Sequence, residues 1–295
     1  MHKYVIAGSV GGLCNRIRCL ISSMRIAEKL SKSLILFWPT NSSCACRFSD
    51  LFENQITQIT QEELQLLMQK NDFNQTYQFH NDWRLLTLPE DGVARNFSQA
   101  LYSEEGNNID FEYHRIPLSV RENILKYLNW LIPKKYITEK VTQFCSKFDD
   151  NTISISIRSW QDENRSKLFD IRNEYKVMDQ ERIGTFFVVS DSAKILEQVK
   201  YRYPQRVLSY PRIVSLGDRG TTEGIQDAFV ELLLLAKNKK LKVSHLSTYS
   251  EMAWWFGACR AKVETIPVTF KGRLSLAIEE IKVRIRKFFS KILHK

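Results

Sequence analysis

Residues 4–38 read YVIAGSVGGLCNRIRCLISSMRIAEKLSKSLILFW, and this stretch decides the fold that we expect. A short apolar strand over 4–7 runs into a glycine-rich turn. A helix over 13–30 follows, and a second strand comes at 34–38. Such a strand–helix–strand unit takes roughly 30 residues and favours parallel pairing of its two strands. The sequence therefore predicts an α/β fold that begins at the N-terminus.

The turn of this unit is a candidate binding site. Gly11 and Gly12 would let a ligand approach the backbone closely, and Asn15, Arg16 and Arg18 open the helix, where backbone amides favour anions. A sugar or phosphate site is one interpretation, and a tight connection that needs glycine is the other. The glycine spacing is not G-x-G-x-x-G, so the turn disfavours a nicotinamide dehydrogenase.

Length and charge suggest two domains and a basic tail. The chain has 295 residues and a net charge of +10. We expect α/β domains over 1–149 and 150–266, joined at the polar turn Asp149-Asp150-Asn151. Residues 271–295 hold eight Lys or Arg and two Glu, a surplus of six positive charges. The basic charge is thus concentrated in the tail and indicates an anionic partner.

The second half repeats the alternation of strands and helices. Buried strands are predicted over 151–160, 185–189, 206–210 and 241–245, the last of them as the final strand. Helices are predicted over 118–131, 138–148, 192–201, 221–238 and 248–257. This alternation predicts a second parallel sheet.

Polar clusters follow three of these strands, where ligands bind in such sheets. They are Arg158 to Asp162, Ser190 to Ser192, and Ser247 to Ser250. Ser192 and Thr248 are also ordinary helix-capping residues, so a purely structural role is open for them. Arg158 is different, because an arginine that ends an apolar strand must be paired or must face a charged ligand.

Four segments together carry a family resemblance. They are GGLCNRIRCLISSMRIAEKL (11–30), SISIRSW (154–160), FFVVSDS (186–192) and GIQDAFVELLLLAKNKKLKVSHLSTYSEMAWWFG (224–257). In this order they resemble the fucosyltransferase superfamily, which includes nodulation-type α1,6-fucosyltransferases and protein O-fucosyltransferases. The likeness covers most of residues 4–258.

The resemblance implies a GT-B-like fold of two Rossmann-like domains that face a cleft. It also implies an inverting, metal-independent glycosyltransferase that uses a nucleotide sugar, typically GDP-fucose, bound mainly by the C-terminal domain. By the family pattern, Gly11, Gly12 and Asn15 face the cleft, and Arg158 contacts the diphosphate. The histidine of the family's H-x-R pattern is replaced by Ser156, a departure that bears on the identity of the sugar and on contacts with the base.

Further donor-binding residues are implied by the same resemblance. Ser190-Asp191 matches the family's serine/threonine-aspartate pair, and Asp227 matches the aspartate associated with the nucleotide base. The hydroxyl cluster that holds phosphates matches Ser247, Thr248 and Ser250. No D-x-D-like metal motif is evident.

Glycosyl transfer builds negative charge on the departing diphosphate, and a fixed guanidinium with hydroxyl donors can stabilise that charge. A base must also deprotonate the acceptor hydroxyl. Asp162 and Glu163 follow Arg158 and are candidates, and Asp82 is a rival. A surface acid is the plainer interpretation of each. His80 is interpreted as structural or acceptor-binding.

The sequence shows no signal-like or membrane-spanning stretch, so we expect a cytoplasmic location. In that compartment the six cysteines are expected to be reduced thiols. A zinc site formed by Cys14, Cys19, Cys44 and Cys46 is disfavoured, because paired C-x-x-C units are missing.

The tail, residues 267–295, predicts one amphipathic helix. Its apolar residues recur every three or four positions, namely Leu274, Ile278, Ile281, Ile285, Phe288 and Ile292. Such a basic helix could lie on the inner membrane face or pack back across the N-terminal domain. A membrane position fits a glycan or lipid-linked glycan acceptor in cell-surface polysaccharide synthesis.

Two alternatives remain. The same fold could use another nucleotide sugar, or the tail could bind nucleic acid. Against the second, aromatic side chains do not interleave with the basic run, except at Phe288 and Phe289.

Overall fold

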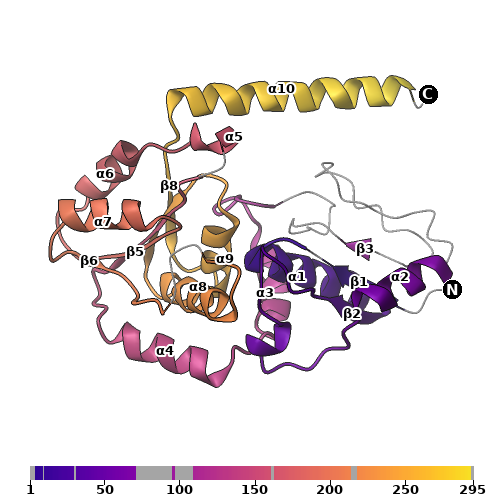
Figure 1. Ribbon diagram of the computed structural model, residues 1–295. Helices are drawn as coiled ribbons and strands as arrows, with labels where there is room; N and C mark the ends of the chain where they lie inside the picture. The colour runs from indigo at the N-terminus through magenta and orange to yellow at the C-terminus, as the bar shows by residue number, and fades with distance from the viewer. Residues whose placement is uncertain are drawn as a thin grey trace.

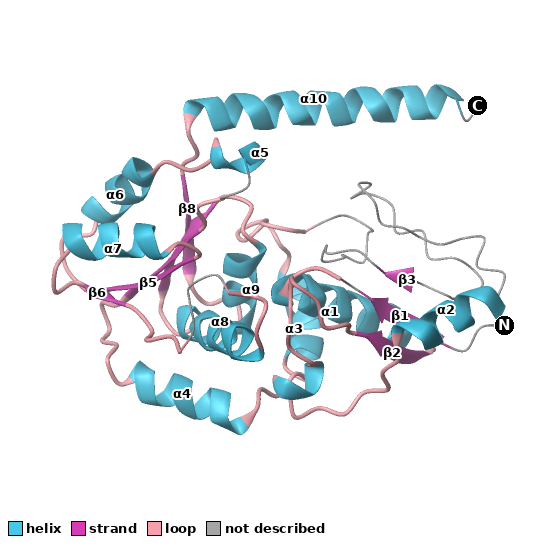
Figure 2. Ribbon diagram, in the orientation of Figure 1, coloured by secondary structure: helices cyan, strands magenta, loops and turns pink. Residues whose placement is uncertain are grey.

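The computed structural model describes residues 4–8, 10–29, 31–70, 95–96, 109–160, 163–213 and 218–293. Within these residues the strands form two separate parallel sheets, one in each half of the chain (Figure 1). Helices lie around both sheets, and one long helix runs along the edge of the molecule (Figure 2).

The first sheet contains the predicted strand–helix–strand unit. β1 (Tyr4–Gly8) pairs in parallel with β2 (Ser33–Phe37), and α1 (Leu13–Lys29) connects them. A two-residue strand, β3 (Arg95–Asn96), pairs with the other edge of β1. The sequence interpretation of this unit is confirmed.

The second sheet has five parallel strands in the order β6-β5-β4-β7-β8. They are β4 (Ile153–Ile157), β5 (Phe186–Ser190), β6 (Val207–Leu208), β7 (Lys240–Ser244) and β8 (Lys262–Ile266). The chain leaves β4 toward one edge and returns to β7 on its other side. The order therefore reverses between β4 and β7, and ligands of open α/β sheets bind at such a switch point.

The remaining helices surround these sheets. They are η1 (Phe48–Asp50), α2 (Gln61–Lys70), α3 (Leu118–Leu128), α4 (Lys135–Cys145), α5 (Glu163–Ser166), α6 (Ile171–Asp179), α7 (Ala193–Arg202), α8 (Thr222–Leu235), α9 (Thr248–Phe256) and α10 (Phe270–Leu293).

Two sequence predictions need correction, and one helix was missed. Residues 241–245 do not form the final strand, because β8 comes later as an edge strand. The helix α6 was not predicted. Thr248 is not the cap of α9, because the Ser247 side chain accepts from the Ser250 backbone N–H instead, whereas Ser192 caps α7 as expected.

The hydrophobic core crosses the boundary predicted at residues 149 and 150. One continuous cluster joins Leu20 of α1 and Ile137 of α4 to Phe229 of α8 and Trp254 of α9. Phe144 of α4 also contacts Phe187 of β5, with ring centroids 5.6 Å apart. The helix α4 thus packs on the second half, although it precedes the predicted boundary.

The turn before β5 requires a glycine. Gly184 has φ +101°, and a Cβ there would lie 2.3 Å from the Asn151 carbonyl oxygen. We expect Gly184→Ala to lower the free energy of unfolding by roughly 2 kcal/mol or more, because strain and a backbone clash add. Urea unfolding checks this.

Gly220→Ala is the matched control. A Cβ at Gly220 would lie 3.5 Å from Asp218 Oδ1, which is an ordinary contact. Equal destabilisation by the two substitutions would contradict the strain assigned to Gly184.

Candidate functional site

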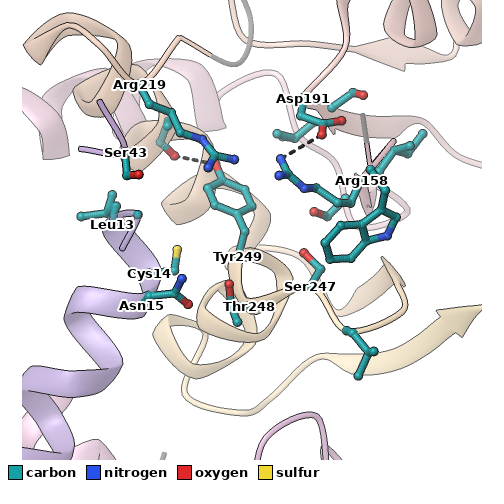
Figure 3. A pocket seen from close by; sticks show the side chains of 18 of the residues that line it. Leu13, Cys14, Asn15, Ser43, Arg158, Asp191, Arg219, Ser247, Thr248 and Tyr249 are labelled. Carbon is teal, nitrogen blue, oxygen red and sulfur yellow. Dashed lines mark hydrogen bonds and ion pairs between the residues drawn. The ribbon is translucent and has the colours of Figure 1, made fainter. Parts of the chain in front are cut away.

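A cavity of about 470 Å³ opens where the two halves meet, beside the carboxyl ends of β4 and β5. The N-terminal turns of α1 and α9 face each other across it (Figure 3). Its polar and charged lining comprises Asn15, Arg18, Ser43, Asp110, Ser156, Arg158, Arg165, Ser190, Asp191, Arg212, Asp218, Arg219, Ser247, Thr248 and Tyr249. The switch point of the second sheet therefore coincides with a cavity rich in arginine.

Arg158 comes directly after β4 and is held in the cavity by a carboxylate. Its Nη1 lies 2.8 Å from Asp191 Oδ2, and Asp191 Oδ1 accepts from the Ser159 backbone N–H at 2.9 Å. The Arg158 backbone N–H donates to Ser244 Oγ of β7. The residues after β4 and β5 and the end of β7 thus hold one another, and the guanidinium is oriented before any ligand binds.

Burial lowers the pKa of the Arg158 guanidinium, the Asp191 carboxylate opposes this, and the positive charges of Arg219 and Arg165 add to the lowering. An arginine pKa starts so high that the group stays charged. The cavity therefore holds several cations near one another, an arrangement that a bound anion would stabilise.

Trp160 lies within cation–π distance of two of these cations. The guanidinium carbons of Arg158 and Arg165 lie 5.4 and 5.1 Å from its ring centroid. Trp160 has φ 51°, an uncommon conformation for a bulky side chain. Such backbone strain persists where surrounding contacts enforce it, as it does at many ligand sites.

The loop before α8 supplies two more arginines. Arg212 forms an ion pair with Glu231, which is 2% exposed and whose pKa is raised to about 7 by burial. Arg219 lies in a turn in which Asp218 accepts from the Gly220 backbone N–H and the Thr221 hydroxyl. The Arg219 carbonyl also accepts from the Ala45 backbone N–H at 3.0 Å, which ties this turn to the first half.

The start of α9 contributes hydroxyl groups. Ser247 caps the helix, and Thr248 and Tyr249 line the cavity beside it. The Tyr249 hydroxyl donates to the Ala228 carbonyl at 2.5 Å. A helix N-terminus carries partial positive charge, so α9 adds to the anion-binding character of the cavity.

The glycine turn has a divided role. Gly12 and Asn15 line the cavity as predicted, and a Cβ at Gly12 would lie 3.9 Å from Arg219 Nη1. Arg16, in contrast, is not among the residues that line the cavity. Its side chain donates to the carbonyls of Gly11 and Pro39, at 2.6 and 2.5 Å, and so fixes the turn.

Arg18 is also committed to the protein. It forms an ion pair with Asp110 and lies 3.7 Å from Glu251 of α9. Glu251 also accepts from the Phe111 backbone N–H at 2.9 Å, and burial raises its pKa. The sequence had suggested Arg18 as an anion-binding group, but its charge is used to join the two halves.

Two predicted donor-binding residues lie behind the cavity lining. Asp227 is fully buried; it accepts from the Ile213 backbone N–H at 2.9 Å and lies 3.6 Å from Lys140 Nζ. Ser250 is fully buried and donates to Ser156 Oγ at 2.9 Å. In this structure they position the residues in front of them, and no surface of either is exposed to a ligand.

The candidate bases and the candidate histidine are not placed by the structure. Asp162, Asp82 and His80 lie outside the described residues, and the Glu163 side chain is likewise not described, although α5 begins at Glu163. Gly11 lies in the turn just before the lining residue Gly12.

The described residues contain no group of three or more His, Cys, Asp or Glu side chains arranged to hold a metal ion. Cys14 lines the cavity, but burial raises its pKa to about 12, so it is a neutral thiol. Among its described residues, the cavity therefore offers guanidinium groups, hydroxyls and amides beside the carboxylates of Asp110, Asp191 and Asp218.

No sequence pattern had indicated Arg165, Arg212 or Arg219 as site residues. Each lies in or beside a loop with no strand-end motif, and only the fold brings it to Arg158. Arginines that precede a capped helix, as Arg219 precedes Thr221, are a signal that could have been searched for.

The role of Asp227 can be tested by stability. Asp227→Ala removes the buried carboxylate that accepts from the Ile213 backbone N–H, and we expect a loss of about 1.5–3 kcal/mol in the free energy of unfolding, as for other hydrogen bonds to charged groups. Asp227→Asn keeps an acceptor oxygen and should lose clearly less. Urea unfolding of both variants measures this. If the two variants lose the same free energy of unfolding, the negative charge that faces Lys140 stabilises the protein, and the hydrogen bond to Ile213 does not.

No protein-family model matches the chain, and no curated protein matches it in sequence. Solved structures do match. A NodZ α-1,6-fucosyltransferase soaked with GDP-fucose has a TM-score of 0.54 at 16% identity, over 87% of this chain and 93% of that one; a NodZ structure in the same group is from Bradyrhizobium.

Two further neighbours agree. A mutant of Arabidopsis thaliana FUT1 in complex with GDP has a TM-score of 0.56 at 17% identity, over 90% of this chain and 70% of that one. The apo form of POFUT1 has a TM-score of 0.53 at 11% identity, over 89% of this chain and 97% of that one. The chain therefore shares its fold with these solved fucosyltransferases, as the sequence motifs predicted.

Proposed function

We propose that this protein is a glycosyltransferase that moves fucose from GDP-fucose onto a glycan acceptor, with inversion and without a metal ion. The observation that carries the proposal is the convergence of Arg158, Arg165, Arg212 and Arg219 on one cavity at the sheet's switch point. The fold supports it, because neighbours of this fold are fucosyltransferases solved with GDP or GDP-fucose.

The donor would bind with its diphosphate near Arg158. A diphosphate presents several oxygens to the bidentate geometry of guanidinium groups. Ser247, Thr248 and the N-terminus of α9 would donate to the same oxygens. Ser190 and Asp191 would hold the nucleoside side, while Asp227 would act through the Ile213 backbone and Ser250 through Ser156.

The leaving group gains negative charge as the glycosidic bond to the diphosphate breaks. Arg158 is already oriented by Asp191, so it can stabilise that charge without reorganisation in the transition state. Several guanidinium groups supply positive charge of the kind that a divalent cation supplies in other enzymes, which is the physical basis for metal independence.

The acceptor would approach from the first half. Gly11, Gly12 and Asn15 would lie beside the transferred sugar, and a base would take the proton of the attacking hydroxyl. Asp162 and Glu163, which come after Arg158 in the chain, are the proposed bases. Asp110 is a further acid in the cavity, but it is paired with Arg18.

The two sheets support a GT-B arrangement of two α/β domains, 1–149 and 150–266, with the cavity between them and α4 of the first range packed on the second. A cytoplasmic enzyme at the inner membrane face that builds cell-surface glycans fits the basic tail. Transfer from another nucleotide sugar is the second candidate, and Ser156, in place of the family's histidine, favours testing it.

Nucleotide specificity tests the proposal. GDP should raise the melting temperature, with a stabilisation of about 2.7 kcal/mol at a hundredfold excess over Kd, while UDP and CMP should not. Thermal-shift measurements with the three nucleotides check this. A shift with UDP or CMP alone would point to the second candidate, and no shift with any nucleotide would overturn both.

Arg158 can be tested separately. Arg158→Ala should weaken GDP binding by roughly tenfold or more, because a charge-assisted contact to the diphosphate is lost. GDP release from GDP-fucose should fall further, because the same charge stabilises the leaving group. Calorimetry and a GDP-release assay measure the two effects.

Arg172→Ala is the matched control, since the Arg172 side chain is 80% exposed and pairs with Asp170 away from the cavity. Near-normal GDP release by the Arg158→Ala variant would remove Arg158 from the site.

A further inference from the structure

The helix α10 presents an exposed apolar stripe. Phe270, Leu274, Ile278, Ile281 and Ile285 are 75, 55, 45, 56 and 50% exposed. Successive members are three or four residues apart, so they share one face of the helix. The sequence had left open that this helix packs back across the N-terminal domain, but none of these five side chains is buried by the described residues.

The helix is held at its first turn. Thr269 Oγ1 donates to the Lys167 carbonyl and accepts from the Gly272 backbone N–H. Gly272 packs so closely that a Cβ there would lie 2.9 Å from the Lys167 carbonyl oxygen. Beyond this turn α10 runs along the edge of the molecule, away from α6 and α7 (Figure 1).

This attachment places the start of α10 beside the residues that follow α5. Lys167 and Leu168 come directly after α5, and Arg165 of α5 lines the cavity beside Trp160. A partner that binds the start of α10 would thus lie close to α5, which contributes Arg165 to the cavity lining.

The charges beside the stripe distinguish two possible partners, a second copy of the chain and an anionic surface. The spacing from Leu274 through Ile292 alternates between four and three residues, which could also form a coiled coil with a second copy. Positions that flank the stripe in that register include Lys282, Arg284 and Lys291, with no acid among them. Two copies would therefore place like charges together, whereas an anionic surface would be complementary to them.

We propose that α10 binds the surface of an anionic lipid bilayer, with its stripe in the acyl boundary and its Lys and Arg side chains at the headgroups. Exposed Lys271, Arg273 and Lys282 lie along the same part of the helix as the stripe. Within the described residues no helix is long and apolar enough to cross a membrane, so the contact is with the surface.

The proposal deepens the proposed function, on which its consequence for the substrate rests. A cavity whose α5 side lies at the bilayer suits an acceptor glycan that is itself attached to a lipid.

Vesicle binding tests the proposal without donor or acceptor. The full chain should float with vesicles of phosphatidylcholine and phosphatidylglycerol, should not float with phosphatidylcholine alone, and should dissociate at high salt. Leu274→Gln/Ile278→Gln/Ile281→Gln keeps the charge and should weaken binding by about tenfold or more, because the apolar contact is lost.

The matched control is Leu66→Gln/Leu118→Gln/Ile183→Gln. These side chains are 52, 69 and 77% exposed and lie outside α10, so this variant should bind vesicles as the wild type does. Equal binding by the stripe variant would overturn the proposal, as would binding to phosphatidylcholine alone.

Sedimentation velocity distinguishes the second copy. If the wild type is a dimer that the stripe variant abolishes, and if it does not bind vesicles, the stripe serves self-association and the proposed membrane contact is overturned.

A GDP thermal shift on the stripe variant separates the membrane proposal from the proposed function. If GDP raises the melting temperature but the wild type does not bind vesicles, only the membrane contact is rejected. If the wild type binds vesicles but GDP does not raise the melting temperature, only the proposed GDP-sugar donor is rejected.

Discussion

One buried arginine links the two halves of the molecule electrostatically, beside the hydrophobic core that they share. Arg18 of α1 is 1% exposed and meets Asp110 and, on α9, Glu251. A buried carboxylate without a cation nearby is costly, so moving α9 away from α1 would leave Glu251 without the Arg18 charge, although Arg18 would keep Asp110. Both helices begin at the cavity, and Asn15 and Thr248 therefore stay opposite each other (Figure 3).

The second constraint is the strand order of the larger sheet. Because β4 lies between β5 and β7, the carboxyl ends of these three strands meet at one edge. Asp191 can then hold both the Arg158 side chain and the Ser159 backbone, while Ser244 holds the Arg158 backbone. This preorganisation matters for a reaction that creates charge on a leaving group, since fixed donors need no reorganisation when that charge appears.

Positive charge serves two purposes in two places. In the cavity, Arg158 and Arg212 each have a carboxylate partner that keeps them in position, and Arg219 is placed by the turn that Asp218 stabilises. On α10 the cations flank an exposed apolar stripe and lie on a helix attached near Thr269 and Gly272. The first arrangement suits one small anion in a defined pose, and the second suits an extended anionic surface.

The sequence by itself determined the two parallel sheets and most helix positions, and it pointed to Arg158, Asn15 and Thr248, which line the cavity. These depend on local periodicity and on the residue types at the end of each strand. The tertiary structure alone decided that Arg16 and Arg18 act within the protein and that Asp227 and Ser250 lie behind the lining. It also decided that three further arginines, Arg165, Arg212 and Arg219, join the site. Such roles depend on contacts between residues far apart in the chain, for which local pattern carries no signal.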